Sequence, residues 1–328
     1  MIKLYTDFSE IASENPFRIA FDDEEAIDTG GVCRDMFSGF WKTAFEKFFD
    51  GSGSVVPATY PNLDMSSLPI IGAILSHGYI VCGFLPVHMS FPVLAAILLG
   101  PTFQIQDSTL RESFVNYLNY HDASILRDGF HEIDLGEQAF SSKTSSGILS
   151  LLSVFGSRQI PTPKSLVPLL TSVARHEFLV KPLGALYAMN SGIPNEHTKF
   201  WKEMKVDSLL EVYLKCTPTA ASVLKVIKEP NQLNDAQSTV FNYLLQYVGN
   251  MQRDKIRDFL RFVTGSSALV VDTITVTFNA LSGLCRRPIP HTCSCTLELP
   301  VSYATLVEFS KEFDALLSSE MAWIMNSV

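Results

Sequence analysis

Charged residues and cysteines are scarce in this sequence, and both shortages limit what the protein can be. Of its 328 residues, 18% are charged and 47% are hydrophobic, which is typical of a packed globular chain and excludes a largely disordered one. Its 6 cysteines are spread out, without the density of a secreted disulfide scaffold. The opening residues, MIKLYTDFSE, lack the apolar core of a signal peptide. We therefore expect reduced thiols and a cytoplasmic or nuclear location.

An excess of basic residues is also missing, because the formal net charge at pH 7 is -9. Nucleic-acid binding needs Lys and Arg to neutralise phosphates, so nucleic acid is not expected as a partner. The pair Gly30-Gly31 is not followed by the lysine that a phosphate-binding loop requires. No second ligand pair lies near His291 and Cys293 to complete a structural zinc site. The sequence therefore predicts neither a cofactor nor a metal.

Charge is absent altogether between Asp64 and Asp107. Within this stretch, the segment from Leu68 to Val87 is long enough to span a bilayer. Glycines and prolines interrupt it, however, and helices that are apolar all round also occur in the interior of large soluble domains. We therefore expect buried core helices here and no membrane span.

The stretch from Cys285 to Pro300, CRRPIPHTCSCTLELP, carries the candidate chemistry. From His291 onward its residues alternate with a period of two, which predicts a half-buried strand. Pro288 and Pro290 cannot donate to a sheet ladder, so we expect an exposed loop before Cys293. The thiol of Cys293 would then be reachable at the mouth of the strand. The competing interpretation is that cysteines on the apolar side of a strand are simply core residues.

This stretch resembles the end of the catalytic lobe of HECT-type ubiquitin ligases, whose nucleophilic cysteine directly follows a His-Thr pair. The matching residues are His291, Thr292, Cys293, Leu297, Glu298, Leu299 and Pro300. The family commonly has Phe-Asn after the cysteine, where this chain has Ser294 and Cys295. The resemblance implies that Cys293 is the residue that accepts ubiquitin.

Two further patches resemble the same family. The IDxGGxxRE signature of its amino-terminal lobe is matched by Ile27, Asp28, Gly30, Gly31 and Arg34, with Asp35 in place of Glu. The F(L/I)xFVTG motif of its carboxy-terminal lobe is matched by FLRFVTG, from Phe259 to Gly265. In the family the first signature is structural, so we assign its residues no catalytic role. The chain starts later than a complete HECT domain usually does, and we interpret it as a divergent one lacking the N-terminal helices.

The resemblance implies an α+β fold with two lobes. We expect a mostly helical amino-terminal lobe with small sheets over residues 1–215, a linker over 216–234, and a smaller α/β lobe carrying the cysteine over 235–328. Residues 101–163 stand where the family inserts its docking subdomain for the conjugating enzyme, and are a candidate divergent docking region. The residues themselves predict two amphipathic helices from Val240 to Leu269, a strand from Val270 to Phe278, and a final helix after Pro300.

The function implied is that of a ubiquitin ligase. Cys293 would take ubiquitin from a conjugating enzyme as a thioester and pass it to a lysine of a protein substrate. Candidate supporting residues are His291, Thr292 and Glu298, of which Glu298 could accept the proton of the lysine amine or orient it. Candidates for contact with the ubiquitin tail are Thr264, Arg286 and Arg287.

Two other classes of function stay open. One is a HECT-derived module that binds ubiquitin or the conjugating enzyme with weak or no transfer. It is indicated by the Ser294-Cys295 pair and by the absence of the C-terminal phenylalanine that helps catalysis in many family members, for which Trp323 or Met325 could substitute. The other is a cysteine hydrolase, which needs a histidine base and an orienting residue.

Overall fold

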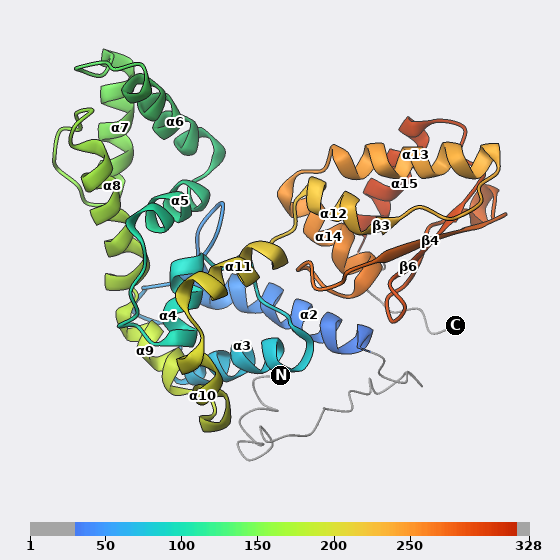
Figure 1. Ribbon diagram of the computed structural model, residues 1–328, viewed down its shortest axis with the longest axis horizontal. Helices are drawn as coiled ribbons and strands as arrows, with labels where there is room; N and C mark the ends of the chain where they lie inside the picture. Colours follow the sequence, from blue (N-terminus) through green and yellow to red (C-terminus); the bar gives the residue numbers. More distant parts are fainter. Residues whose placement is uncertain (1–29, 320–328) are drawn as a thin grey trace. The chain divides into compact units, whose positions relative to one another are not determined.

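The computed structural model describes residues 30–319, which form many helices and two small sheets (Figure 1). This mixed content confirms the α+β class, whereas the expected two-lobed arrangement stays a prediction. Ile27 and Asp28 of the first signature, and Trp323 and Met325 near the C-terminus, lie outside the described residues.

The chain divides into two compact units. Unit 1 contains, among the described residues, Thr43–His77 and Val87–Glu211, and unit 2 contains residues 30–42, Gly78–Pro86 and residues 212–319. Unit 2 therefore joins the segment after Gly30 to the C-terminal third of the chain. The expected lobe boundaries at residues 215 and 235 stay predictions.

Unit 1 is mainly helical. It contains the end of α2 (Gly31–Phe48) and an antiparallel pair of two-residue strands, β1 (Phe49–Asp50) and β2 (Val56–Pro57). The 3-10 turn η1 (Met65–Ser67) leads into α3 (Leu68–Cys82), most of which belongs to this unit. The other elements are α4 (Phe91–Leu99), α5 (Asp107–Tyr117), α6 (Tyr120–Asp134), α7 (Ser142–Val154), α8 (Leu166–Arg175), the π-helical turn η2 (His176–Val180), α9 (Leu183–Ser191), α10 (Asn195–Glu203) and the start of α11 (Val206–Cys216).

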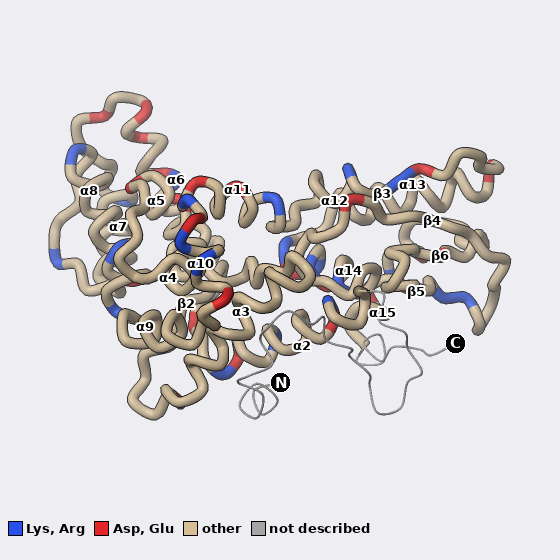
Figure 2. The backbone as a smooth tube through the Cα atoms, turned by 60° about the horizontal axis from the view of Figure 1, so that its bottom comes forward, with Lys and Arg blue, Asp and Glu red and all other residues tan. Residues whose placement is uncertain are grey.

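Helices α3 and α4 come from the charge-free stretch, and Figure 2 accordingly shows no Lys, Arg, Asp or Glu along α4. Every residue of α4 from Phe91 to Leu98 is buried, as are Leu68, Ile71 and Ile74 of α3, which confirms core helices at these positions. Within residues 30–319, the helical segment Met65–Cys82 is also long and apolar enough to cross a membrane, with a mean hydropathy of 1.5 and 44% of it buried inside the protein. Core helices pass the same test, so the absence of a membrane span stays a prediction.

Unit 2 contains a four-stranded sheet with the strand order β3-β4-β6-β5. Strands β3 (Ile227–Lys228), β4 (Ile274–Asn279) and β6 (Thr296–Pro300) are parallel, and β5 (Ile289–His291) pairs antiparallel with β6 at one edge. The remaining elements are α12 (Ala220–Val226), α13 (Asp235–Gly249), α14 (Arg253–Thr264), the 3-10 turn η3 (Gly283–Cys285) and α15 (Leu306–Ser318).

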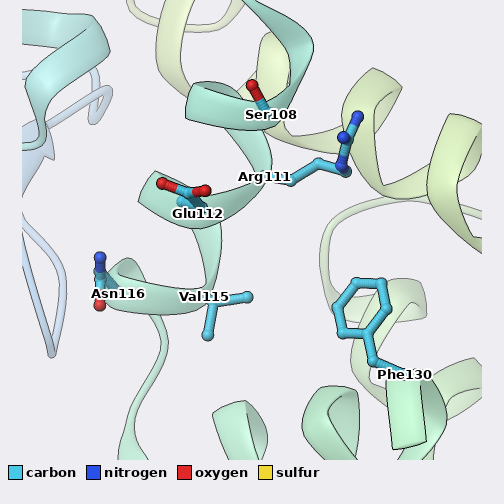
Figure 3. A pocket seen from close by; sticks show the side chains of 6 residues that line it. All are labelled: Ser108, Arg111, Glu112, Val115, Asn116 and Phe130. Atoms are coloured by element: carbon cyan, nitrogen blue, oxygen red, sulfur yellow. The ribbon is translucent and has the colours of Figure 1, made fainter. Parts of the chain in front are cut away.

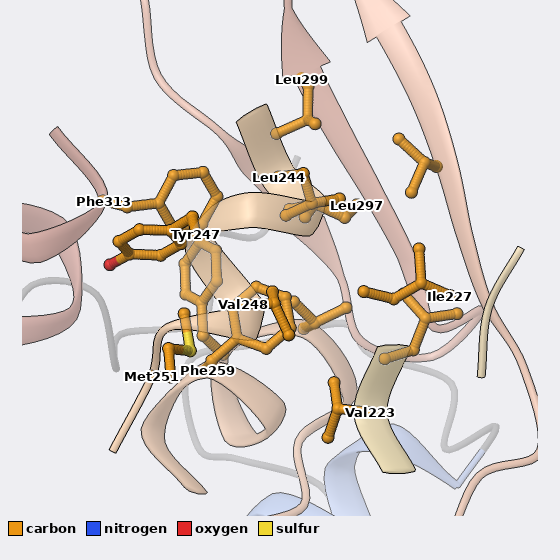
Figure 4. Packing of buried hydrophobic residues seen from close by; sticks show 14 of the residues in the cluster. Val223, Ile227, Leu244, Tyr247, Val248, Met251, Phe259, Leu297, Leu299 and Phe313 are labelled. Carbon is orange, nitrogen blue, oxygen red and sulfur yellow. The ribbon is translucent and has the colours of Figure 1, made fainter. Parts of the chain in front are cut away.

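A single apolar core joins α13, α14 and α15 to this sheet (Figure 4). Helix α14 buries Ile256, Phe259, Leu260 and Val263 at helical spacing, and Gly265, with φ 76°, ends it in the left-handed conformation. The core also includes Leu297 and Leu299 of β6 and Phe309 and Phe313 of α15, all 0% exposed. The two amphipathic helices and the final helix are thus confirmed, whereas the strand predicted from Val270 to Phe278 begins only at Ile274.

Candidate functional site

Cys293 lies in the tight turn that joins β5 to β6. Residues 292–295 form this turn, and the amide of Cys295 donates to the carbonyl of Thr292 across it, with an N–O distance of 3.4 Å. The thiol of Cys293 is free and exposed, as predicted, and the interpretation of both cysteines as core residues is wrong. Only Leu297 and Leu299 of the alternating run enter the core.

The predicted strand from His291 onward is wrong for residues 292–295, because β6 begins only at Thr296. Cys295 has φ 51°, a left-handed conformation that a strand residue does not adopt. The exposed loop expected before Cys293 is also wrong. Pro288 is buried, and Ile289–His291 forms the edge strand β5, where proline is tolerated because one side of the strand has no neighbour.

Two of the predicted supporting residues form a hydrogen-bonded row beside the turn. The Nε2 atom of His291 lies 3.1 Å from Oε2 of Glu298, and the side-chain amide of Asn279 donates to Oε1 of Glu298 over 2.9 Å. The hydrogen bond with His291, followed by that with Asn279, lowers the pKa of the Glu298 carboxyl. Glu298 therefore stays ionised near neutral pH and holds the imidazole that immediately precedes the turn of Cys293.

Arg34 holds the turn from the other side, a role that sequence reasoning missed. Its Nη2 atom donates to the carbonyl oxygen of Thr292 over 2.9 Å and lies 3.4 Å from Sγ of Cys295, while Nε donates to the carbonyl oxygen of Thr264 over 2.8 Å. Thr292, the third predicted supporting residue, thus contributes its backbone carbonyl to this contact. One guanidinium links three segments that are far apart in sequence.

The start of α2 is packed directly against the turn. A Cβ atom added to Gly31 would lie 2.8 Å from the backbone nitrogen of Cys293, and one added to Gly265 would lie 2.6 Å from the carbonyl oxygen of Gly31. Asp35 also pairs with Nε of Arg261 at 2.8 Å, so the acidic residue of the signature binds α14. The Gly-Gly, Thr-Gly and His-Thr-Cys motifs therefore meet at one place. The only sequence signal that could have suggested this closeness is that all three motifs resemble the same family.

The residues proposed to contact a ubiquitin tail are largely occupied within the protein. The side chain of Thr264 is 0% exposed, and its hydroxyl donates to the carbonyl oxygen of Leu260. Arg286 forms ion pairs with Glu308 and Glu312, and its guanidinium lies over the ring of Tyr303. The expectation is therefore wrong for the buried Thr264, and it stays a prediction for Arg286 and for the exposed Arg287.

Residues 101–163, the candidate docking region, contain α5, α6 and α7 of unit 1. A cavity of about 350 Å³ opens between α5 and α6 (Figure 3). Its lining residues are Ser108, Arg111, Glu112, Val115, Asn116 and Phe130. This cavity lies in unit 1 and contains no residue of the Cys293 site, and the docking role of the region stays a prediction. Nowhere in residues 30–319 do three His, Cys, Asp or Glu side chains gather as metal ligands would.

The comparisons with known proteins point to one family. Residues 186–319 match the HECT-domain (ubiquitin-transferase) family. The match runs from α9 to the end of α15 and includes Cys293, His291, Thr292 and Glu298. No curated protein matches the chain. The match supports a HECT-type catalytic domain in this part of the chain, and such a domain implies in general an interaction with ubiquitin, a conjugating enzyme and a substrate.

Proposed function

We propose that this protein, whose residues 186–319 match the HECT-domain (ubiquitin-transferase) family, is a ubiquitin ligase that forms a thioester on Cys293. The observation that carries the proposal is the free, exposed thiol of Cys293 in the β5–β6 turn, directly after the His-Thr pair. A sulfur that must receive the tail of another protein has to be reachable from solvent. The turn meets this requirement, while Arg34 and Glu298 hold its two flanks.

The first step is thioester exchange. The Cys293 thiolate attacks the carbonyl carbon of the thioester between ubiquitin and the conjugating enzyme, forms a new carbon–sulfur bond, and expels the enzyme's cysteine as a thiolate. One thioester replaces another, so the step is nearly balanced in energy. Holding the sulfur and the carbonyl in line therefore matters more than acid–base help.

The second step passes ubiquitin to a lysine of the substrate. The lysine amine attacks the thioester carbonyl, the Cys293 thiolate leaves, and the nitrogen must lose a proton. A carboxylate whose pKa is lowered is a weak proton acceptor near neutral pH, which makes Glu298 better suited to orient His291 than to act as the base. When Nε2 of His291 donates to Glu298, Nδ1 carries the lone pair that accepts the proton.

The partners of the proposed reaction are ubiquitin, a conjugating enzyme and a protein substrate. We propose that the conjugating enzyme docks on residues 101–163. We further propose that the domain has two lobes and that the protein acts in the cytoplasm or nucleus. The acidic net charge of -9 suits basic protein surfaces better than nucleic acid.

The proposal is tested by incubating the protein with ubiquitin, an activating enzyme and a panel of conjugating enzymes. Wild-type protein is expected to gain a ubiquitin adduct that thiols release, and Cys293→Ala is expected to gain none. Cys285→Ser is the matched control, because Cys285 is also exposed and lies in the same segment. An adduct that survives in Cys293→Ala, or its absence with every conjugating enzyme, would contradict the proposal.

The second candidate function is a HECT-derived module that binds ubiquitin or the conjugating enzyme without efficient transfer. It is favoured by Ser294 and Cys295, which replace the usual Phe-Asn pair, and by the match to the family over residues 186–319 alone. Binding of ubiquitin or a conjugating enzyme without any adduct would select it. A hydrolase would instead cleave a fluorogenic ester of ubiquitin with rapid turnover.

A further inference from the structure

The β5–β6 turn contains two thiols. Cys293 is exposed, and Cys295, two residues later, is partly buried in the same turn. Neither thiol is in a disulfide. In the family that the segment resembles, Phe-Asn commonly fills the two positions after the nucleophile, so the second thiol is a feature of this chain.

The backbone of the turn brings the two residues within reach of a covalent bond. Two Cα–Cα steps span at most about 7 Å when extended and less in a turn, and disulfides join Cα atoms about 4.4–6.8 Å apart. The left-handed conformation of Cys295, with φ 51°, folds the chain back at this point. The hydrogen bond from its amide to the carbonyl of Thr292 closes the turn.

The sulfur of Cys295 is partly buried and contacts other groups of the protein. Its sulfur lies 3.4 Å from Nη2 of Arg34, and its carbonyl oxygen accepts a hydrogen bond from the amide of Thr275 in β4. Burial raises the pKa of the Cys295 thiol, an effect that Arg34 opposes and the neighbouring Cys293 increases. The electrostatic effect of Cys293 on the Cys295 thiol agrees with their closeness. Oxidants in solution therefore meet Cys293 first, because it is the exposed thiol.

We propose that Cys293 and Cys295 form a redox pair, in which Cys295 is the resolving thiol for peroxide-oxidised Cys293. Peroxide transfers one oxygen to the sulfur of Cys293, giving a sulfenic acid and a first molecule of water. The sulfur of Cys295 then attacks that sulfur, the S–S bond forms, the S–O bond breaks, and the hydroxyl group leaves with the Cys295 proton as a second molecule of water. Two thiols and one peroxide yield one disulfide and two waters.

The disulfide would have two consequences for the site. It removes the nucleophilic electron pair of Cys293, so that ubiquitin transfer stops; this consequence rests on the proposed function. It also protects the sulfur, because a disulfide returns to two thiols by exchange with an external thiol, whereas a sulfinic acid does not. Arg34 favours the return, since its positive charge stabilises a departing Cys295 thiolate.

The test is a peptide map of the full chain after treatment with hydrogen peroxide and then an alkylating reagent. In wild-type protein, the peptide that carries both cysteines is expected to lose two hydrogen atoms and to resist alkylation, and dithiothreitol restores both thiols. In Cys295→Ser, Cys293 is expected to proceed to sulfinic acid, which dithiothreitol does not reverse. Cys285→Ser, which removes another exposed thiol of the segment, is expected to behave as wild type.

Two results would overturn the inference: sulfinic acid forming on Cys293 as fast in wild type as in Cys295→Ser, or a bridge from Cys293 to Cys285 instead. If Cys295→Ser fails to fold, the peptide map of the wild-type protein decides by itself, because it shows whether the disulfide between Cys293 and Cys295 is present or absent. The ubiquitin adduct assay separates this inference from the proposed function. If the reduced protein forms no ubiquitin adduct, the proposed ligase function is refuted, and the peptide map still decides whether the two cysteines form a redox pair. If the oxidised protein forms as much adduct as the reduced protein, only the redox pair is refuted.

Discussion

Adding one methyl group to Gly31 tests whether the turn of Cys293 depends on the start of helix α2. The new Cβ would lie 2.8 Å from the nitrogen of Cys293, 2.9 Å from the carbonyl carbon of Thr292 and 3.0 Å from Cα of Cys293. Carbon atoms pack best at about 3.5–4.0 Å. All three contacts are to backbone atoms, which cannot rotate away as the end of a flexible side chain can, so the turn has to move by up to about 1 Å.

The expected magnitudes follow from this geometry. Overpacking of this kind costs about 1–3 kcal/mol, and alanine in place of glycine in a helix returns about 0.5–1 kcal/mol. Gly31→Ala should therefore lower the free energy of unfolding by up to about 2.5 kcal/mol. The effect on the proposed transfer should be larger, because a displacement of about 1 Å at a reacting group can cost about 10²-fold in rate.

Urea unfolding and single-turnover formation of the ubiquitin adduct measure the two effects. The matched control is Gly184→Ala in α9, where a Cβ meets no atom within 4 Å and stability should stay the same or rise by about 0.4–1 kcal/mol. If Gly31→Ala were as stable as this control and formed the adduct at the wild-type rate, the turn would not depend on close packing against Gly31.

Three further perturbations have defined outcomes. Arg34→Ala removes hydrogen bonds to two backbone carbonyls and should lower the free energy of unfolding in urea by about 2 kcal/mol, with partial recovery in Arg34→Lys, which lacks the planar fork. An unchanged unfolding midpoint would contradict the role of Arg34 in holding the turn. Glu298→Gln should leave formation of the ubiquitin adduct intact but slow the transfer of ubiquitin to lysine by about 10–100-fold, because it weakens the hydrogen bond that orients His291. Equal effects on the two steps would argue against Glu298 orienting His291. Burial, with a smaller effect of His197, lowers the pKa of His77 from 6.5 to about 4, so the unfolded chain binds this proton at a higher pH than the folded one. The free energy of unfolding should therefore fall by about 2 kcal/mol as the pH is lowered from 7 to 5. His77→Asn should remove this fall, and an equal fall in wild type and His77→Asn would show that His77 is protonated as easily in the folded protein as in the unfolded chain.

Local patterns in the sequence predicted much of unit 2. The spacing of Ile256, Phe259, Leu260 and Val263 predicts a helix with one buried face, and α14 has this face because a helix places such residues on one side. Gly265 at its end takes the left-handed conformation that glycine adopts at no steric cost. Patterns of this kind act within a few residues, so they can be recognised without any knowledge of the rest of the chain.

The same patterns failed where the tertiary structure decides the backbone. Alternation from His291 to Leu299 could not distinguish a continuous strand from a turn at residues 292–295, because a period of two carries no information on the sign of φ at Cys295. Local sequence also gave no sign of the ion pairs of Arg286, because the carboxylates that bind it, Glu308 and Glu312, come from the final helix.

The sequence by itself therefore determined helices α13, α14 and α15 of unit 2, the candidate nucleophile and the family that its motifs resemble. It did not predict α12 and β3, which lie in the segment expected to be a linker. Only the tertiary structure decided what holds the nucleophile in place. The hydrogen bonds of Arg34 reach residues 230 and 258 positions away, and Gly31 packs on the backbone of Cys293. Contacts across such separations depend on how whole elements pack, and no local periodicity encodes them.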